Sequence, residues 1–127
     1  MNENNTIYNK TFKFAVRIVK LYKFLCKTHK EHIISKQLLR CGTSIGANVN
    51  EAIAAQSKKD FISKMSIANK EARETKYWIE LLIETDYLST NESYVKSLQK
   101  EIEEIIKILT SIVKTSQNNL KKEQNVK

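Results

Sequence analysis

The sequence predicts an all-α protein, an antiparallel up-and-down four-helix bundle. Its 127 residues include no proline and only two glycines, so the residues that interrupt helices and form tight hairpins are almost absent. Apolar residues recur at alternating spacings of three and four in four separate segments, which is the period of an amphipathic helix. Short polar connections favour antiparallel neighbours within a single domain over residues 1–127.

The first helix is predicted over residues 9–28. The apolar stripe that we expect to face the core consists of Phe12, Ala15, Val19, Tyr22 and Cys26, widened by Val16 and Leu25. A polar interval at residues 28–32 separates it from a second helix, predicted over residues 34–56. The stripe of that second helix carries one polar residue and consists of Leu38, Cys41, Ile45, Asn48, Ala52 and Ala55.

The third and fourth helices each follow a capping signature. Residues 57–60 (SKKD) have the form of a capping box, so a third helix is predicted over residues 58–84. Its stripe consists of Phe61, Met65, Ala68, Ala72, Thr75, Ile79 and Leu82. Residues 89–92 (STNE) repeat the signature before a fourth helix, predicted over residues 91–116 and followed by a disordered tail at 117–127. The stripe of the fourth helix consists of Val95, Leu98, Ile102, Ile105, Leu109 and Ile112.

The net charge of +8 lies in the first half of the chain. Residues 1–64 hold 12 basic and 4 acidic residues, whereas residues 65–127 hold 10 of each. Such asymmetry favours a polyanion or an acidic protein as partner. The predicted nucleic-acid-binding stripe lies on the first helix and consists of Lys10, Lys13, Arg17, Lys20 and Lys27, with Lys23 and Lys30 at its margin. Binding through lysines would be largely independent of nucleotide sequence and weakened by salt. The alternative is a solvated face that keeps the protein soluble.

Residues 41–52 (CGTSIGANVNEA) place both glycines inside a predicted helix, where each costs about 1 kcal/mol relative to alanine. Gly42 and Gly46 lie one turn apart on one face, which lets another backbone approach closely. Two interpretations stay open: a bulky neighbour within the bundle, such as Trp78 or Tyr77, or a contact between subunits.

A polar set accompanies these glycines. Asn48 is expected to be buried and therefore to need a hydrogen-bond partner. Candidate partners are Glu51, Glu71, Glu74 or a backbone carbonyl across the helix pair. We interpret the set as a device that fixes helix register first, and as a functional site second.

No cluster of residues predicts catalysis, a metal site or a cofactor. The only candidate ligands, Cys26, His29, Glu31 and His32, fall near the end of the first helix with no second cluster downstream. No Glu-x-x-His pair of the kind that holds a di-iron centre occurs. The protein is therefore predicted not to be an enzyme. Isolated cysteines, no signal-peptide pattern and no apolar stretch of about 20 residues predict a soluble cytoplasmic protein without membrane contact.

An ordered set of unusual residues resembles the bacterial four-helix bundle protein family, that of the 23S rRNA intervening-sequence proteins. The residues that carry the resemblance are 37–40 (QLLR), 42–48 (GTSIGAN), 51–52 (EA), 58–61 (KKDF) and 70–82 (KEARETKYWIELL). The family is related to the accessory variability determinant of diversity-generating retroelements. The resemblance implies an antiparallel bundle, often a homopentamer, encoded in rRNA insertions or beside a reverse transcriptase.

Two functional hypotheses follow. The first is a homo-oligomeric accessory protein that binds RNA or DNA, with a reverse transcriptase or another protein as a further partner. The second is a protein interaction scaffold that never contacts nucleic acid.

Overall fold

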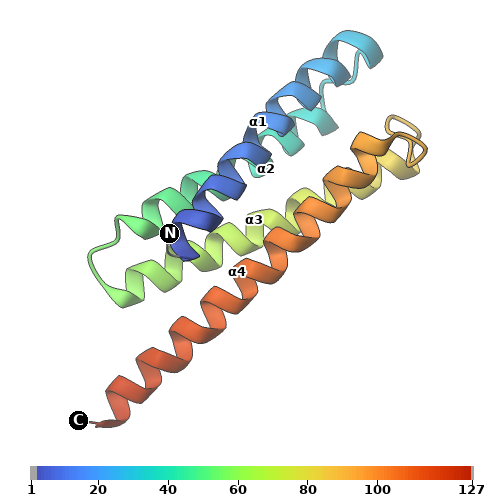
Figure 1. Ribbon diagram of the computed structural model, residues 1–127. Coiled ribbons are helices and arrows are strands. Elements are labelled where there is room, and N and C mark those ends of the chain that lie inside the picture. The colour runs from blue at the N-terminus through green and yellow to red at the C-terminus, as the bar shows by residue number, and fades with distance from the viewer. Residues whose placement is uncertain (1–2, 127) are drawn as a thin grey trace.

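The computed structural model describes residues 3–126, with side-chain surroundings from residue 6 onward, and contains four helices: α1 (Glu3–His29), α2 (Ile34–Ile53), α3 (Lys58–Glu84) and α4 (Ser93–Val126). Each helix turns back on the preceding one (Figure 1). Helix α2 packs against α1 and α3, and α4 packs against α3 and, least closely, against α1. The predicted antiparallel four-helix bundle is confirmed.

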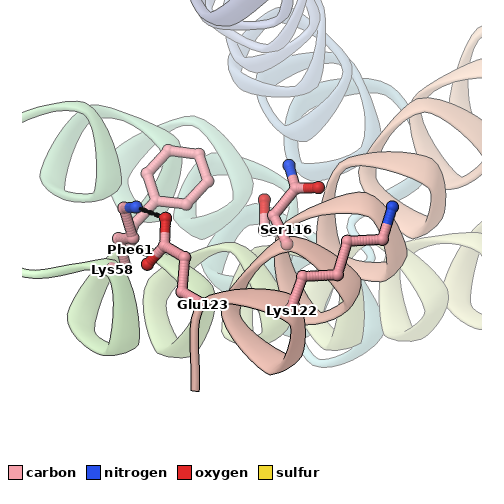
Figure 2. Close-up of a pocket in the computed structure, with 6 residues that line it drawn as sticks. Lys58, Phe61, Ser116, Lys122 and Glu123 are labelled. Atoms are coloured by element: carbon pink, nitrogen blue, oxygen red, sulfur yellow. Dashed lines mark hydrogen bonds and ion pairs between the residues drawn. The ribbon is translucent and has the colours of Figure 1, made fainter. Parts of the chain in front are cut away.

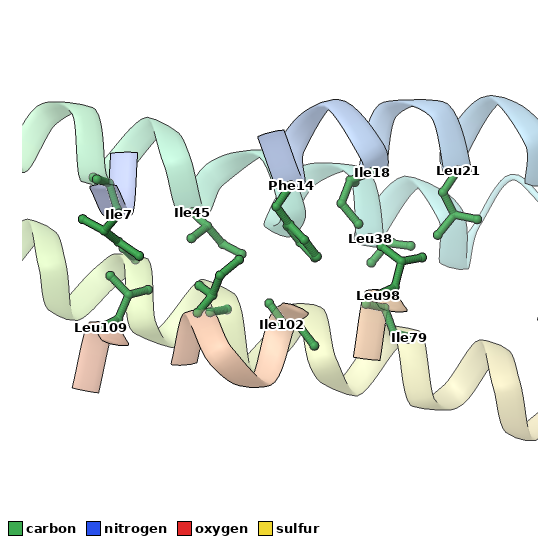
Figure 3. Close-up of a cluster of buried hydrophobic side chains, with 14 of the residues drawn as sticks. Ile7, Phe14, Ile18, Leu21, Leu38, Ile45, Ile79, Leu98, Ile102 and Leu109 are labelled. Carbon is green, nitrogen blue, oxygen red and sulfur yellow. The ribbon is translucent and has the colours of Figure 1, made fainter. Parts of the chain in front are cut away.

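Helices α3 and α4 bury the faces that their periodicity predicts. Of the predicted α3 stripe, all residues except the half-buried Phe61 are buried. The six predicted residues of α4 are all buried. They meet side chains of α1 and α2 in one continuous core (Figure 3). The agreement follows from heptad spacing, because residues three and four apart stay on one face of a helix.

Helix α1 buries a different face from the predicted one. Phe12 is 56% exposed and Val16 is 40% exposed, whereas Leu25 alone of the predicted stripe is buried. The residues that face the core are Ile7, Thr11, Phe14, Ile18, Leu21 and Leu25. The prediction of the α1 stripe is wrong because α1 carries apolar residues on two faces, and only the neighbouring helices decide which face completes the core.

The connection between α1 and α2 is built around the carboxylate of Glu31. It accepts hydrogen bonds from the backbone N–H groups of Ile33, Ile34 and Ser35 at 3.1, 3.0 and 2.6 Å. The Ser35 hydroxyl donates to the Glu31 carbonyl at 2.7 Å. Glu31 thus satisfies the free N–H groups at the start of α2, as a capping side chain does. Lys30 adopts the left-handed backbone conformation, with φ of 54°, and this lets the chain turn there.

The ends of the other helices follow the predictions closely but not fully. Helix α3 has the predicted bounds, and the Ser57 hydroxyl accepts the N–H of Asp60 at 3.0 Å. Helix α2 ends at Ile53, three residues before the predicted end, and α1 begins six residues before its predicted start. Helix α4 begins at Ser93 because Ser89 forms a turn, in which its hydroxyl accepts the N–H of Asn91 at 3.2 Å.

The predicted disordered tail is wrong for residues 117–126, since α4 continues as a helix to Val126. No glycine or proline interrupts the chain there, and each residue added to an existing helix gains one backbone hydrogen bond without a new nucleation cost. The extension also packs against the start of α3. Lys58 pairs with Glu123 beside an open hollow lined by Phe61 and Ser116 (Figure 2).

Candidate nucleic-acid interface

The basic stripe predicted on α1 divides into two groups. Lys10 and Arg17 turn toward α4, where the Lys10 ammonium lies 2.9 Å from Glu104 and an Arg17 Nη1 lies 3.2 Å from Glu101. Arg17 also donates to the Ser97 hydroxyl at 3.1 Å and to the Tyr94 carbonyl at 3.2 Å. These bonds join α1 to α4 at the least closely packed of the four helix interfaces. Two of the five predicted cations therefore have partners within the chain.

The other three residues of the predicted stripe are free to meet a ligand. Lys13, Lys20 and Lys27 are exposed and have no acidic partner within 4.0 Å among the described residues. They are seven residues apart, so they form one line along α1 with steps of about 10 Å. Three point charges in a line suit a phosphate backbone, which also repeats its charge regularly.

A hollow of about 280 Å³ opens beside this line, between α1 and the start of α4. Its lining consists of Arg17, Lys20, Leu21, Phe24, Tyr94 and Leu98. Phe24 is 40% exposed and Tyr94 is 39% exposed, so each presents part of its ring to solvent. Burial raises the pKa of Tyr94 and the nearby Glu92 raises it further, which keeps the phenol neutral.

Phe24 and Tyr94 are candidate binding residues that the sequence analysis missed. Aromatic rings next to cations are the combination on which unpaired bases stack in single-stranded nucleic-acid sites. The spacing of Lys20 and Phe24, one helical turn apart, is the sequence signal for this arrangement. The position of Tyr94 is a consequence of the α1–α4 packing and has no local signal.

The two glycines of α2 serve packing inside the chain. A Cβ at Gly42 would lie 2.8 Å from Cγ2 of Ile18, and a Cβ at Gly46 would lie 3.4 Å from the backbone of Thr11. Both glycines are buried against α1. The proposed neighbours Trp78 and Tyr77 are thus incorrect, and this face is not available to a second subunit.

The polar set predicted around Asn48 does not form one site. Asn48 is only partly buried, and its amide donates to the carbonyl and the hydroxyl of Ser44 at 2.9 and 3.0 Å, within its own helix. Glu51 lies 4.0 Å from Lys64 instead. The expectation that a glutamate or a carbonyl of another helix satisfies Asn48 is therefore wrong.

Glu71 and Glu74 share a different partner, Arg40 of α2. The Arg40 guanidinium bonds to Glu71 at 3.1 Å and to Glu74, and Glu74 also accepts the indole N–H of Trp78 at 3.4 Å. The two carboxylates thus join α3 to α2 one turn apart. This geometry supports a role in helix register for these two residues.

The described residues include no candidate metal site, and the buried thiol of Cys41 is not activated. No group of three His, Cys, Asp or Glu side chains between residues 6 and 126 lies close enough to hold an ion. Burial raises the pKa of the Cys41 thiol to about 11, which keeps it protonated at neutral pH. Within the same part of the chain, no helix has an apolar stretch long enough to cross a bilayer.

Comparison with known proteins gives a family and a solved relative. The family model described as 23S rRNA-intervening sequence protein matches residues 3–111. A crystal structure of a protein of unknown function from the S23 ribosomal protein family of Bacteroides thetaiotaomicron VPI-5482 is 52% identical to the chain. The match covers 89% of this chain and 99% of the other, with a TM-score of 0.84. No curated protein matches the chain.

Proposed function

Because the chain belongs to the family of 23S rRNA-intervening sequence proteins, we propose that it is an accessory protein that binds nucleic acid and performs no catalysis. The observation that carries the proposal is the separation of charge. Eight carboxylates form ion pairs with six basic side chains, most of them at helix interfaces. Of the 22 lysines and arginines, Lys127 lies outside the described residues, and 15 others have no acidic partner within 4.0 Å among the side chains that the structure describes.

On α1, the ligands for phosphate are Lys13, Lys20 and Lys27. A lysine ammonium is a point charge without the planar fork that reads base edges, so binding depends on backbone charge and not on nucleotide sequence. Each contact releases counterions, and log K for a duplex falls by about 0.9 per contact for each tenfold rise in salt. The family description names 23S rRNA, so a structured RNA is the first ligand to test.

The experiment compares the wild type with the variant Lys13→Gln/Lys20→Gln/Lys27→Gln on a structured RNA and on duplex DNA, by fluorescence anisotropy across a salt series. The matched control is Lys36→Gln/Lys59→Gln/Lys70→Gln, which removes three exposed, unpaired charges from α2 and α3. We expect the α1 variant to reduce the salt slope by about 2 to 3, and the control by much less. Absence of wild-type binding at low salt would refute the proposed function.

We also propose that the protein is a homo-oligomer, which would multiply each weak site. The support is the outer face of α1, where Phe12 and Val16 are exposed beside the half-buried Val19. Exposed apolar side chains that gather on one face are typical of protein contacts. Light scattering of the wild type and of Phe12→Ser/Val16→Ser tests this, and a monomeric wild type at micromolar concentration would contradict it.

The same apolar face supports the second candidate function, a protein interaction scaffold. Under this hypothesis Phe12 and Val16 contact a different protein, and nucleic acid takes no part. Affinity capture from the native host after nuclease treatment separates the two functions. A protein partner that survives nuclease treatment, together with no RNA or DNA binding by the purified chain, would favour the scaffold.

A further inference from the structure

Five lysines form a row along the outer face of α4. All are exposed, and none has an acidic partner within 4.0 Å among the described residues. The members of this α4 lysine row are Lys96, Lys100, Lys107, Lys114 and Lys121. Successive members are four or seven residues apart, so they stay on one face of the helix over about 37 Å.

The row lies opposite the face that α4 buries. Lys107 and Lys114 each follow a buried residue, Ile105 and Ile112, by two positions, which is about 200° around the helix. A straight helix therefore presents the row to solvent as a rigid line. The charges need no rearrangement of the backbone to meet a long ligand.

The carboxylates of α4 form their ion pairs with other helices and not with the lysines of the row. Glu101 and Glu104 pair with Arg17 and Lys10 of α1, and Glu123 pairs with Lys58 of α3. Glu103 lies 3.6 Å from Lys76 of α3. The charges of Lys100 and Lys107 add to that of Lys10 in lowering the pKa of Glu104, but neither of these two lysines forms an ion pair with it. Each acid of α4 is thus engaged with a neighbouring helix, and the lysines carry the net charge of the outer face.

The surroundings of the row match a polyanion and not a protein. The exposed residues between the lysines are all polar, and those closest to the line of the row on the helix surface include Glu103, Ser111 and Asn118. Protein interfaces need an apolar centre and are depleted in lysine, and this face has no apolar centre. A nucleic-acid duplex carries one charge per about 1.7 Å, so about 20 phosphate charges lie along a row of this length.

We propose that the α4 lysine row is a second binding surface for the phosphodiester backbone of nucleic acid, separate from the lysines of α1. The inference rests on the proposed function and adds a site to it. Lysines without aromatic neighbours bind the backbone alone, so the row takes duplex and single-stranded segments without base preference. The α1 line, with its adjacent hollow, differs in having rings on which a base can stack.

The test adds one variant to the salt series, Lys100→Gln/Lys107→Gln/Lys114→Gln, with the α2 and α3 triple variant as the charge-matched control. All three substituted lysines are exposed, so helicity by circular dichroism should equal that of the wild type. On an RNA duplex of about 20 base pairs we expect the salt slope to fall by about 2.7, and the control slope to fall by much less. Between 50 and 200 mM salt the variant then loses about 40-fold less affinity than the wild type.

The outcomes separate this inference from the proposed function. If the wild type binds neither RNA nor DNA at low salt, both fail. If the wild type binds and the α4 variant keeps the wild-type slope, the row is not a site, while the α1 proposal is judged by its own variant. The same variant is also tested for binding to vesicles of phosphatidylserine, in addition to RNA and DNA. If the α4 variant loses binding to these vesicles and keeps its affinity for both nucleic acids, the occupant is a membrane and the inference is overturned.

Discussion

The two glycines of α2 should respond in opposite directions to the same substitution, although they lie one turn apart. At Gly42, a new Cβ would lie 2.8 and 2.9 Å from Cγ2 and Cγ1 of Ile18 and 3.3 Å from its Cβ. These atoms belong to a β-branched side chain with one preferred rotamer in a helix, so it cannot turn away cheaply. At Gly46, the nearest atoms are those of Thr11 at 3.4 and 3.5 Å, which is ordinary van der Waals contact.

The magnitudes follow from two opposing terms. Replacing a helical glycine by alanine stabilises the helix by about 1 kcal/mol. Overpacking a core by one carbon costs about 1–3 kcal/mol. Gly46→Ala has only the first term, so we expect a gain of about 0.5–1 kcal/mol. Gly42→Ala has both terms, so we expect a net loss of about 1 kcal/mol.

Urea unfolding followed by circular dichroism measures both variants at one protein concentration, because assembly would shift the apparent stability. The midpoints of the two variants should differ by about 1 M urea. Ile18→Ala, which removes the obstructing atoms, serves as the control. Its cost should be smaller in the Gly42→Ala background than in the wild type. If Gly42→Ala stabilises the chain as much as Gly46→Ala does, Ile18 of α1 does not pack against Gly42 as closely as described.

Three further predictions concern charge and reactivity. Burial opposes ionisation of Glu31, but its hydrogen bonds with Ser35 and two further backbone N–H groups outweigh burial and lower its pKa. The stability that the ionised Glu31 adds is therefore complete above the ordinary carboxyl pKa of about 4.3. It is lost as the pH falls through the lower pKa of the folded state. Urea midpoints should therefore fall more between pH 6 and pH 3 for the wild type than for Glu31→Gln, and equal falls would contradict this role. Glu101→Gln/Glu104→Gln should raise affinity for duplex RNA in anisotropy titrations by releasing two cations, whereas unchanged affinity would mean that those cations do not reach the ligand. Cys41, with a pKa of about 11, should resist alkylation at pH 8 in the folded protein while Cys26 reacts, and equal labelling in mass spectra would refute its burial.

How far the sequence predicts this fold depends on how one-sided each helix is. In α3 and α4 the longest run of apolar residues at heptad spacing is also the face that is buried, so periodicity identifies most of their buried side chains, although Ile67 and Tyr77 of α3 are exposed. Helix α1 has apolar residues on two faces, and the choice between Phe12 and Phe14 depends on partners that periodicity does not reveal. For the same reason the sequence placed Asn48 on the buried stripe of α2, whereas in the structure α2 turns its glycines toward α1 and Asn48 is only partly buried.

To find the candidate sites from the sequence, one would also have to know which charged side chains pair across helices. Equal numbers of acidic and basic residues over 65–127 concealed the α4 lysine row, because a sum over a segment cannot show that acids lie at helix interfaces and lysines outside. The spacing of Lys100, Lys107, Lys114 and Lys121 was readable as one face. The partners of Lys10 and Arg17 could not be identified from the sequence, since Glu104 and Glu101 lie 94 and 84 residues away in the chain.

Those same separations bear on how the protein folds during synthesis. The first three helices can pack as soon as residue 84 is available, because their contacts join neighbours in sequence. The seam between α1 and α4 closes only after α4 has been made, and until then the apolar faces of α1 and α3 that await it stay open to water. The nascent chain is therefore most vulnerable to misassociation while α4 is still being made. The ion pairs of Lys10 and Arg17 lie on this seam, so they can form only once α4 is present.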